Sequence, residues 1–513
     1  MEDYRTVIKL LRKGSFAVSL DLKDAYYMIR VHSDHRKYLR FSFQGVLFEF
    51  KCLVFGLASA PYTFTKIIRP VTQVLRSKGI ISVAYLDDFL LFGNSQSDCL
   101  KNLQFTLLLL DSLGFLLNTK KCCFLPKNFF SFLGFTFDSV NMTIGLPEEK
   151  RTKILKWVCF FKRLRKCKIS KFAQFIGLLT SACPAIKYSW VYTKNFERTK
   201  HLALVSRNYN YNALMVLPSD LSLDFIWWQN NITVSCNPLN KDDFCLEICT
   251  DASLSGWGAY CKGDSAYGWW TSEFQNKHIN LLELQAILFA LQCFTVDLNN
   301  KNILIRTDNT TALACINRMG SVRFPHLNSV ARLIWQWCER KSLWIFASYI
   351  NSKDNWQADR ASRLLTPDTE WCLNDNVFLT IVNQFGKPEI DLFASRDNHK
   401  CSRYISWFRD PGSEAVDAFT MNWTDLFFYA FPPFALILKV LQKIITDKAE
   451  GILIVPFWQS QPWYPLFTRL VVNEPLFFYP SSNLLFSPYS KAKHPLERSL
   501  TLVAARLSGK RSS

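Results

Sequence analysis

Two adjacent carboxylates, Asp87 and Asp88, stand between two short apolar runs, residues 80–84 and 89–92. These runs predict two strands joined by a tight turn, which would present both acids at the tip of a hairpin. Turns usually carry Gly, Asn or a single Asp, because two adjacent anions repel each other unless a cation lies between them. The pair therefore indicates either a surface turn or a cation site.

A third acid, Asp21, ends the apolar run of residues 16–20 and could complete such a site. Transfer of a nucleotidyl group needs carboxylates that hold two Mg²⁺ ions about 3.5–4 Å apart, one to activate the attacking hydroxyl and one to neutralise the leaving pyrophosphate. Three acids suffice for that. The Asp87–Asp88 pair and the motif around Asp21 are each short enough to recur by chance. Their occurrence in one chain is what favours a metal site.

A second set of acids lies further along the chain. Asp251 and Asp308 each follow a predicted strand, Glu283 lies in a predicted amphipathic helix, and Asp359 lies in a short helical segment. Acids at strand ends and helix starts are commonly caps, so each one alone favours a structural role. Their order along the chain, strand-Asp, helix-Glu, strand-Asp and helix-Asp, instead favours a functional role.

The elements that would position these acids fall into blocks. Residues 15–138 read as short strands and helices, and residues 147–206 read as helical. Between Lys150 and Lys171 there are ten Lys or Arg residues and no acid, which predicts a helix with one cationic face; such a face is either solvated or lies along a duplex backbone. We expect a linker over 209–243, and then a second α/β block that ends near 365.

Composition agrees with a nucleic-acid partner. The 513 residues include 61 Lys and Arg against 42 Asp and Glu, a formal charge of +19. Such an excess favours a polyanionic partner through counterion release, although a merely basic protein has the same charge. The hydrophobic share of 49% and the aromatic share of 15% predict ordered globular domains.

The sixteen cysteines are scattered, with no zinc-ligand spacing, and no apolar signal segment precedes them. The longest apolar stretch, residues 426–438, is interrupted by two prolines and is shorter than the ~20 residues a membrane helix needs. We therefore expect reduced thiols, no structural zinc, no membrane partner, and an intracellular protein of the cytoplasm or nucleus that is neither secreted nor transmembrane.

The first set resembles the palm of reverse transcriptases. The resemblance rests on three motifs in order, at residues 21–26, 55–61 and 85–88. It implies that Asp21, Asp87 and Asp88 are the catalytic acids and bind two Mg²⁺, with Mn²⁺ as an alternative. It also implies RNA template, DNA primer and dNTPs as partners.

The same resemblance implies the substrate-binding residues. Tyr26 is similar to the steric gate that excludes a ribose 2′-hydroxyl, and Asp24 and Ala25 precede it. The stretch from Gly56 to Pro61 is similar to the loop under the templating base and the incoming nucleotide. Lys121 resembles a lysine near the triphosphate, and residues 132–135 resemble the hairpin that grips the primer end.

The second set resembles the RNase H fold, whose four carboxylates hold two Mg²⁺ for hydrolysis of the RNA strand in an RNA–DNA hybrid. By this resemblance Asp251, Glu283, Asp308 and Asp359 are catalytic and metal-binding. Relatives often carry a His shortly before the last acid, whereas the nearest preceding His here is His326.

Residues 354–363, joined directly to the tail, resemble DIRS-type retrotransposon polyproteins. The tail motifs 391–395 and 429–434 resemble a segment that has been related to adenine methyltransferases. Phe431 stands where such enzymes carry Asn or Asp and cannot accept a hydrogen bond from an amine, so we expect packing or nucleic-acid binding from the tail instead of methyl transfer.

We therefore expect an α+β multidomain protein. The expected order is a reverse transcriptase palm with incomplete fingers (1–146), a helical thumb or connection with a linker (147–243), an α/β RNase H domain (244–366), and an aromatic-rich α/β tail, for which a methyltransferase-like remnant is one hypothesis (367–513). The expected function is RNA-directed DNA polymerase and ribonuclease H. The alternative is a truncated or domesticated nucleic-acid-binding remnant without polymerase activity.

Overall fold

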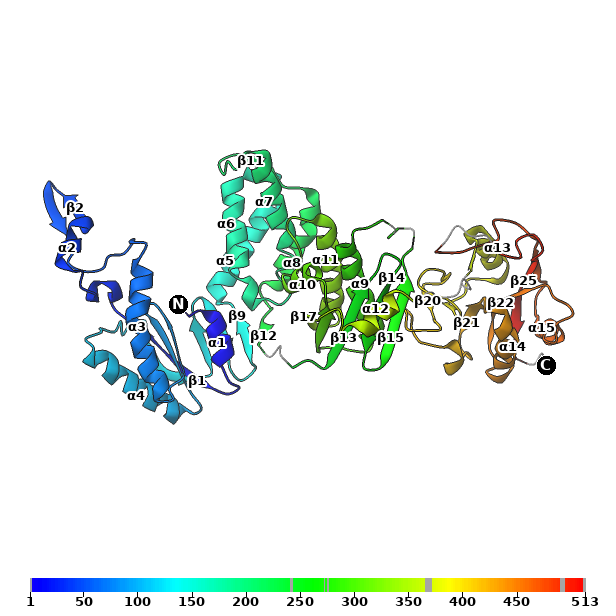
Figure 1. Ribbon diagram of the computed structural model, residues 1–513, viewed down its shortest axis with the longest axis horizontal. Coiled ribbons are helices and arrows are strands. Elements are labelled where there is room, and N and C mark those ends of the chain that lie inside the picture. Colours follow the sequence, from blue (N-terminus) through cyan, green and yellow to red (C-terminus); the bar gives the residue numbers. More distant parts are fainter. Residues whose placement is uncertain are drawn as a thin grey trace. The chain divides into compact units, whose positions relative to one another are not determined.

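The computed structural model describes residues 2–239, 243–271, 273–274, 276–364, 371–489 and 494–510. The chain divides into two compact units, residues 1–241 and 242–513. Both units mix helices with sheets, so the expected mixed α/β multidomain class is confirmed (Figure 1). The expected boundaries at 243 and 366 adjoin or fall within undescribed residues and stay predictions.

The first unit begins with a four-stranded sheet in the order β4-β5-β1-β6. Helices α3 and α4 pack on this sheet around buried Phe64, Phe89 and Leu110. The elements of this part are α1 (Tyr4–Leu10), β1 (Phe16–Asp21), α2 (Ser33–Arg36), β2 (Arg40–Phe43), β3 (Val46–Glu49), α3 (Ala60–Ser77), β4 (Ser82–Tyr85), β5 (Asp88–Gly93), α4 (Gln96–Ser112) and β6 (Cys123–Lys127).

Sequence explains several of these boundaries. Helix α4 starts where the Ser95 hydroxyl accepts a hydrogen bond from the Asp98 amide at 3.1 Å, which satisfies one free N–H of the first turn. Helix α3 carries Pro61 in its first turn, where a missing N–H costs nothing. By contrast, every residue of the hairpin β2–β3 is exposed.

The rest of the first unit holds a second sheet, ordered β12-β9-β8-β7, and a helical part. Aromatic side chains fill the helical core, with Phe161, Phe172 and Phe175 fully buried. The elements are β7 (Phe129–Phe132), β8 (Phe135–Asp138), β9 (Thr143–Gly145), α5 (Glu148–Lys162), β10 (Lys166–Lys168), α6 (Ile169–Thr180), α7 (Lys194–Ser206), β11 (Leu214–Val216), α8 (Ser222–Asn231) and β12 (Asn237–Pro238).

Two expectations need correction here. The expected linker is folded over residues 209–239: β11 pairs with β10, and α8 buries Trp228 completely. Its Asn and Pro residues suggested a linker, but the apolar face of α8 docks on α5 and decides otherwise. The basic run from Lys150 to Lys171 is not one helix, because α5 ends at Lys162 and β10 separates it from α6.

The second unit starts with a five-stranded sheet ordered β15-β14-β13-β16-β17 (Figure 1). Strands β13, β16 and β17 are parallel, and β14 and β15 are antiparallel additions. The elements are β13 (Leu246–Ala252), β14 (Gly256–Cys261), β15 (Asp264–Trp269), α9 (Ile279–Phe294), β16 (Asn302–Thr307), α10 (Thr310–Asn317), α11 (Pro325–Arg340), β17 (Trp344–Tyr349) and α12 (Trp356–Ser362).

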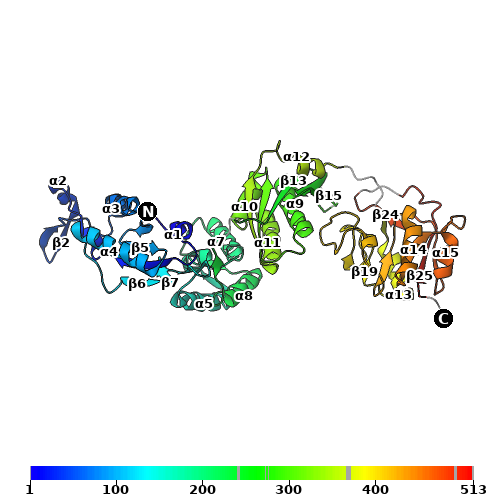
Figure 2. The same cartoon turned by 90° about the horizontal axis from the view of Figure 1, so that it is seen from below.

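A six-stranded sheet ordered β20-β19-β21-β22-β25-β23 forms the core of the tail (Figure 2). Its first four strands are parallel, and β25 runs antiparallel between β22 and β23. The elements are β18 (Cys372–Leu373), α13 (Asp375–Phe385), β19 (Ile390–Asp391), β20 (Arg403–Tyr404), β21 (Phe427–Ala430), α14 (Ile437–Thr446), β22 (Glu450–Pro456), α15 (Tyr464–Leu470), β23 (Leu476–Phe478), β24 (Leu485–Phe486) and β25 (Leu502–Ser508).

Within the described residues, no helix has both the length and the apolar composition to cross a lipid bilayer. All sixteen cysteines are free thiols.

Candidate active sites

The first acid set lies where β1 meets the β4–β5 hairpin. Asp21 and Asp88 are direct partners in the antiparallel register of β1 and β5, and Asp87 occupies the two-residue turn before β5. The Leu22 amide donates to the Asp87 carbonyl at 2.9 Å, which ties the turn to the end of β1. Leu86 has φ +54°, a left-handed conformation that is costly for a branched side chain and is typical of functional turns.

The charges of this site interact. Burial, together with the negative charges of Asp87 and Asp21, raises the pKa of Asp88 to about 6, and Lys121 opposes this increase. The Lys121 ammonium lies 3.5 Å from Asp21 Oδ2. Lys121 was expected near the triphosphate, and the structure puts it beside the carboxylates, where it partly neutralises Asp21.

Tyr26 borders the same acids. Its ring is buried against Phe55 and Phe64, with centroid distances of 4.8 Å and 5.4 Å. Burial raises the pKa of its hydroxyl, and the charge of Asp87 raises it further, so the phenol stays protonated next to the acids. Ala25 is also buried, whereas Asp24 is exposed.

The remaining residues of the first set occupy defined local structure. Gly56 has φ +89°, a conformation that favours glycine, and Pro61 opens α3. Phe132 and Phe135 pair across a two-residue hairpin turn whose Leu133 and Gly134 both have positive φ. A tight hairpin therefore exists at the position expected for contact with the primer end.

The second acid set converges closely. Ligand oxygens of Asp251 on β13, Glu283 on α9 and Asp308 after β16 all lie within 4.8 Å of one another. In the part of the chain that the structure describes, no other group of three His, Cys, Asp or Glu side chains meets this distance, and Asp21, Asp87 and Asp88 do not. Oxygen donors at this spacing suit Mg²⁺ or Mn²⁺.

Burial makes this second cluster unfavourable as three free anions. Burial, together with the charges of Asp251 and Asp308, raises the pKa of Glu283 to about 9, and burial is also the main reason that the pKa of Asp251 is raised to about 6. Glu283 Oε2 is buried and has no hydrogen-bond partner. A divalent cation would satisfy this oxygen and compensate the charges, so these residues fit a bound metal.

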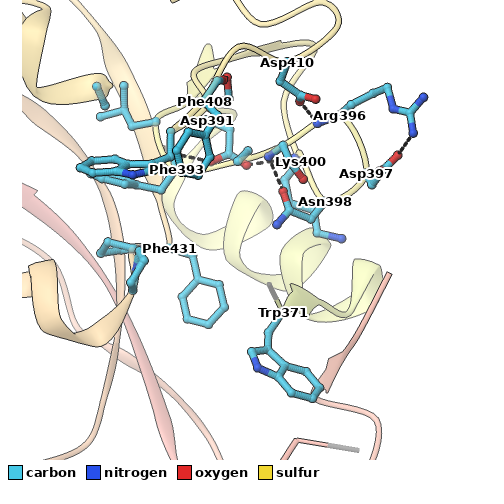
Figure 3. A pocket seen from close by; sticks show the side chains of 18 of the residues that line it. Trp371, Asp391, Phe393, Arg396, Asp397, Asn398, Lys400, Phe408, Asp410 and Phe431 are labelled. Atoms are coloured by element: carbon cyan, nitrogen blue, oxygen red, sulfur yellow. Dashed lines mark hydrogen bonds and ion pairs between the residues drawn. The ribbon is translucent and has the colours of Figure 1, made fainter. Parts of the chain in front are cut away.

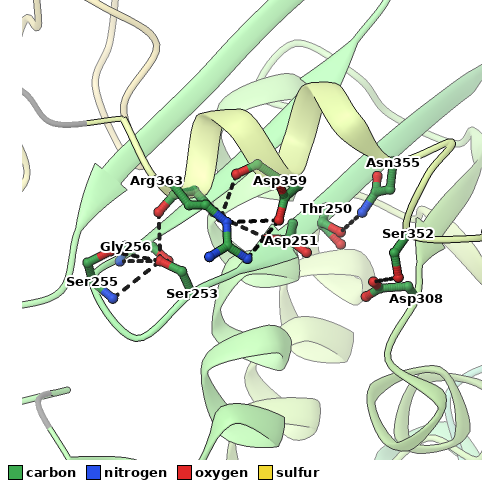
Figure 4. A network of polar contacts seen from close by, with 11 residues as sticks. Thr250, Asp251, Ser253, Ser255, Gly256, Asp308, Ser352, Asn355, Asp359 and Arg363 are labelled. Carbon is green, nitrogen blue, oxygen red and sulfur yellow. Dashed lines mark hydrogen bonds and ion pairs between the residues drawn. The ribbon is translucent and has the colours of Figure 1, made fainter.

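Asp359, the fourth expected ligand, lies outside that group. Its Oδ1 accepts hydrogen bonds at 2.9 Å and 2.8 Å from Nε and Nη2 of Arg363, the residue that directly follows α12 (Figure 4). Its negative charge still raises the pKa of Asp251, so it lies within electrostatic reach of the cluster. Its role as a metal ligand stays a prediction.

Other residues of the 350–363 segment, which sequence reasoning missed, hold the cluster in place (Figure 4). The Ser362 hydroxyl donates to Asp251 Oδ2 at 2.7 Å, and the Ser352 hydroxyl donates to Asp308 Oδ2 at 2.5 Å. The Asn355 amide donates to the Thr250 carbonyl at 3.0 Å. In the sequence, the one feature that pointed to Ser352, Asn355 and Ser362 was that they lie near Asp359.

A glycine allows this approach. A Cβ at Gly258 on β14 would lie 2.3 Å from the Ala358 carbonyl oxygen and 2.4 Å from the Ser362 nitrogen. Since real Cβ atoms do not approach that closely, any larger residue would push α12 away from the sheet. Gly258 therefore determines the position of Ser362 over Asp251.

Residues 1–137 match the family described as reverse transcriptase (RNA-dependent DNA polymerase). The match contains Asp21, Tyr26, Asp87, Asp88 and Lys121. This part of the chain is therefore similar in sequence to reverse transcriptase domains.

Curated relatives are polyproteins of retroelements. The chain is 24% identical over 388 residues to the enzymatic polyprotein of cauliflower mosaic virus (strain D/H), which covers 70% of this chain and 52% of the relative. It is 28% identical over 147 residues to the transposon Tf2-3 polyprotein of Schizosaccharomyces pombe, which covers 29% of this chain and 11% of the relative. The chain thus spans about half the length of the viral relatives that it matches.

Among solved structures, the foamy viral protease-reverse transcriptase in complex with an RNA/DNA hybrid aligns with a TM-score of 0.40. The identity is 15%, over 71% of this chain and 49% of the other. The form described as foamy viral protease-reverse transcriptase dRH, in complex with double-stranded DNA, also aligns with a TM-score of 0.40, at 16% identity, over 68% of this chain and 60% of the other.

Proposed function

We propose that this chain is the polymerase and RNase H part of a retroelement polyprotein, which copies an RNA template into DNA and cleaves the RNA strand of the resulting hybrid. The observation that carries the proposal is the convergence of Asp251, Glu283 and Asp308 from three separate elements of a β15-β14-β13-β16-β17 sheet. The reverse transcriptase match over residues 1–137 supports the polymerase half.

In the polymerase half, Asp21, Asp87 and Asp88 would hold two divalent cations, Mg²⁺ or Mn²⁺. Such ions would activate the primer 3′-hydroxyl and neutralise the leaving pyrophosphate. The chain's own groups would do the rest: Lys121 would offset negative charge beside Asp21, and Tyr26 would stand as a protonated, buried ring beside the dNTP sugar. Gly56 and Pro61 would support the template base.

In the second half, Asp251, Glu283 and Asp308, with Asp359 alongside, would hold the cations for RNA hydrolysis. Bound cations would generate hydroxide from water and stabilise the leaving 3′-oxygen, so no side chain has to act as a nucleophile. Ser362 and Ser352 would orient two of the carboxylates by donating hydrogen bonds to them. Arg363 would hold Asp359 until a metal or substrate competes for it.

The segment 354–363 and its direct connection to the tail favour a DIRS-type element as the source. The viral and transposon polyproteins named above do not bear on this assignment, which rests on the motif resemblance alone.

Two assays test the halves separately. Primer extension on an RNA template with Mg²⁺ should be lost in Asp87→Asn and kept in Asp111→Asn, which changes an exposed acid of α4. Cleavage of an RNA–DNA hybrid should be lost in Asp308→Asn and kept in Asp354→Asn, which changes an exposed acid nearby. Salt-sensitive hybrid binding with neither activity would support the non-catalytic remnant and contradict the proposal.

A further inference from the structure

A cavity of about 540 Å³ lies in the second unit, at the carboxyl ends of β19, β20 and β21. Its lining includes the three loops that follow these strands, at residues 392–400, 406–410 and 431–436. The chain leaves β19 toward β20 on one side of the sheet, and β21 lies on the other side. Such a reversal of strand order is where open parallel sheets bind ligands, and this volume is ordinary for a small-molecule site.

The walls of this cavity are mainly aromatic. Phe431 and Phe434 follow β21, Phe408 follows β20, and Phe393 follows β19, with Trp371 completing the wall (Figure 3). Phe408 remains 55% exposed and Phe431 is half-buried, so part of this ring surface faces open space rather than the core. Aromatic faces on several sides suit a flat ring system that stacks.

The cations that line the cavity are already paired. Arg396 forms an ion pair with Asp397 at 2.8 Å, Arg409 with Asp264 at 2.8 Å, and Lys400 with Asp375. These carboxylates offset the positive charge of the cavity, which weakens its attraction for a phosphate group and favours an uncharged ligand. Burial lowers the pKa of His494, which lines the cavity beside Trp371, so this side chain adds little positive charge near neutral pH.

The loop after β19 is held rigidly in place. Asp391 Oδ2 accepts a hydrogen bond from the Lys400 amide at 3.0 Å, and Asp391 Oδ1 accepts one from the Phe393 amide at 3.3 Å. Asn398 Oδ1 accepts one from the Ser395 amide at 2.6 Å. Because the Asp391 and Asn398 oxygens already hold the loop by these hydrogen bonds, the loop is a preformed wall of the cavity. A ligand would bind without the entropic cost of ordering this loop.

We propose that this cavity binds a nucleobase, stacked between the aromatic side chains around Phe431 and Phe408. The base belongs either to a free nucleoside or to an unpaired nucleotide of a strand. This site is separate from both carboxylate sets and does not depend on either activity. The tail then has a ligand site of its own, in addition to the polymerase and nuclease sites.

The test uses 2-aminopurine, a base whose fluorescence falls on stacking. The full chain is titrated with 2-aminopurine riboside and, separately, with a short single strand that carries one 2-aminopurine. We expect saturable quenching that Phe431→Ala weakens about tenfold. Phe408→Ala, at the more exposed edge, should also weaken binding of the probe. Because Phe408 is exposed, this second variant keeps the test valid if Phe431→Ala does not fold. Tyr479→Ala, which removes a 74% exposed ring outside the cavity, should leave binding unchanged.

The two probes also distinguish the source of the base. Equal affinity for riboside and strand indicates a free nucleoside, and tighter binding of the strand indicates an unpaired nucleotide. Absence of quenching with both probes would overturn the proposal. Quenching by the strand alone that both phenylalanine variants leave unchanged would also overturn it, because the strand would then bind elsewhere.

Discussion

Asp21 and Asp88 face each other across the pair of strands β1 and β5, and the Lys121 ammonium, 100 residues from Asp21 in the sequence, lies 3.5 Å from the Asp21 carboxylate. Burial and two neighbouring anions raise the pKa of Asp88 to about 6, and Lys121 opposes that increase. The protonation of Asp88 therefore depends on Lys121 as well as on burial and the neighbouring carboxylates.

A first prediction concerns that lysine. Wild-type primer extension should rise with pH through about 6, because Asp88 must lose its proton before it can bind a cation. Lys121→Gln removes the positive charge, so the pKa of Asp88 should rise and the rate at pH 6 should fall roughly two- to fivefold relative to the rate at pH 8. The check is a pH series of extension rates at saturating dNTP. Lys120→Gln, an exposed neighbour, is the matched control, and equal pH profiles for the two variants would contradict the prediction.

Tyr26 carries a second prediction, about sugar selection. Its ring is buried against Phe55 and Phe64 beside the acids, so replacing it with alanine should open space on the sugar side of the nucleotide. The ratio of ribonucleotide to deoxyribonucleotide incorporation should rise roughly tenfold or more in Tyr26→Ala. Single-nucleotide extension measures this ratio. Tyr62→Ala removes a 69% exposed ring and should keep the wild-type ratio; an unchanged ratio in Tyr26→Ala would reject the steric role.

Glu283 makes stability depend on pH when chelator removes divalent cations. Its pKa is raised from the ordinary 4.5 to about 9, so the folded state holds this proton more tightly than the unfolded state. The contribution of this proton to the free energy of unfolding is fully present below pH 4.5 and is lost as pH rises through 9. Because the pKa of Asp251 is only about 6, the range from pH 7 to 9 reports mainly on Glu283.

In EDTA, the melting temperature of wild type should therefore fall by roughly 5 °C between pH 7 and 9. Glu283→Gln should show little of this decrease, and Glu273→Gln, an exposed acid, should show all of it. Added Mg²⁺ should reduce the decrease in wild type, because a ligand of the folded state stabilises it. Calorimetry at the two pH values measures each effect, and equal decreases in wild type and Glu283→Gln would refute the assignment.

The basic surface of α5 carries a fourth prediction. Lys153 and Lys156 are exposed on that helix, whereas Arg151 donates to the carbonyls of Leu146, Ile232 and Ser235 and has a structural role. Replacing both lysines with Gln should weaken hybrid binding and lower the slope of log affinity against log salt by about 2. Salt titrations by fluorescence anisotropy measure the slope. Lys387→Gln, an exposed lysine of the tail, should leave it unchanged, and an unaltered slope in the double variant would place the phosphate contacts elsewhere.

Local patterns in the sequence were enough to predict most elements around both sites. Alternating apolar residues and turn residues predicted the hairpin that carries Asp87 and Asp88, and helical periodicity predicted α9 around Glu283. The same reasoning was wrong for residues 209–239, where Asn and Pro suggested a linker. The packing of α8 against α5 and the burial of Trp228 depend on contacts between distant segments, which leave no local pattern.

By itself the sequence determined which acids end strands or lie in helices, and hence which residues can meet at the edge of a sheet. Only the tertiary structure decided which of them do: Asp251, Glu283 and Asp308 converge, Asp359 turns to Arg363, and Lys121 reaches Asp21. The physical reason is that strand and helix propensities act over a few neighbouring residues, whereas side-chain distances depend on the approach of whole elements. Gly258 illustrates this, because its missing Cβ admits α12 to the sheet and so brings Ser362 to Asp251.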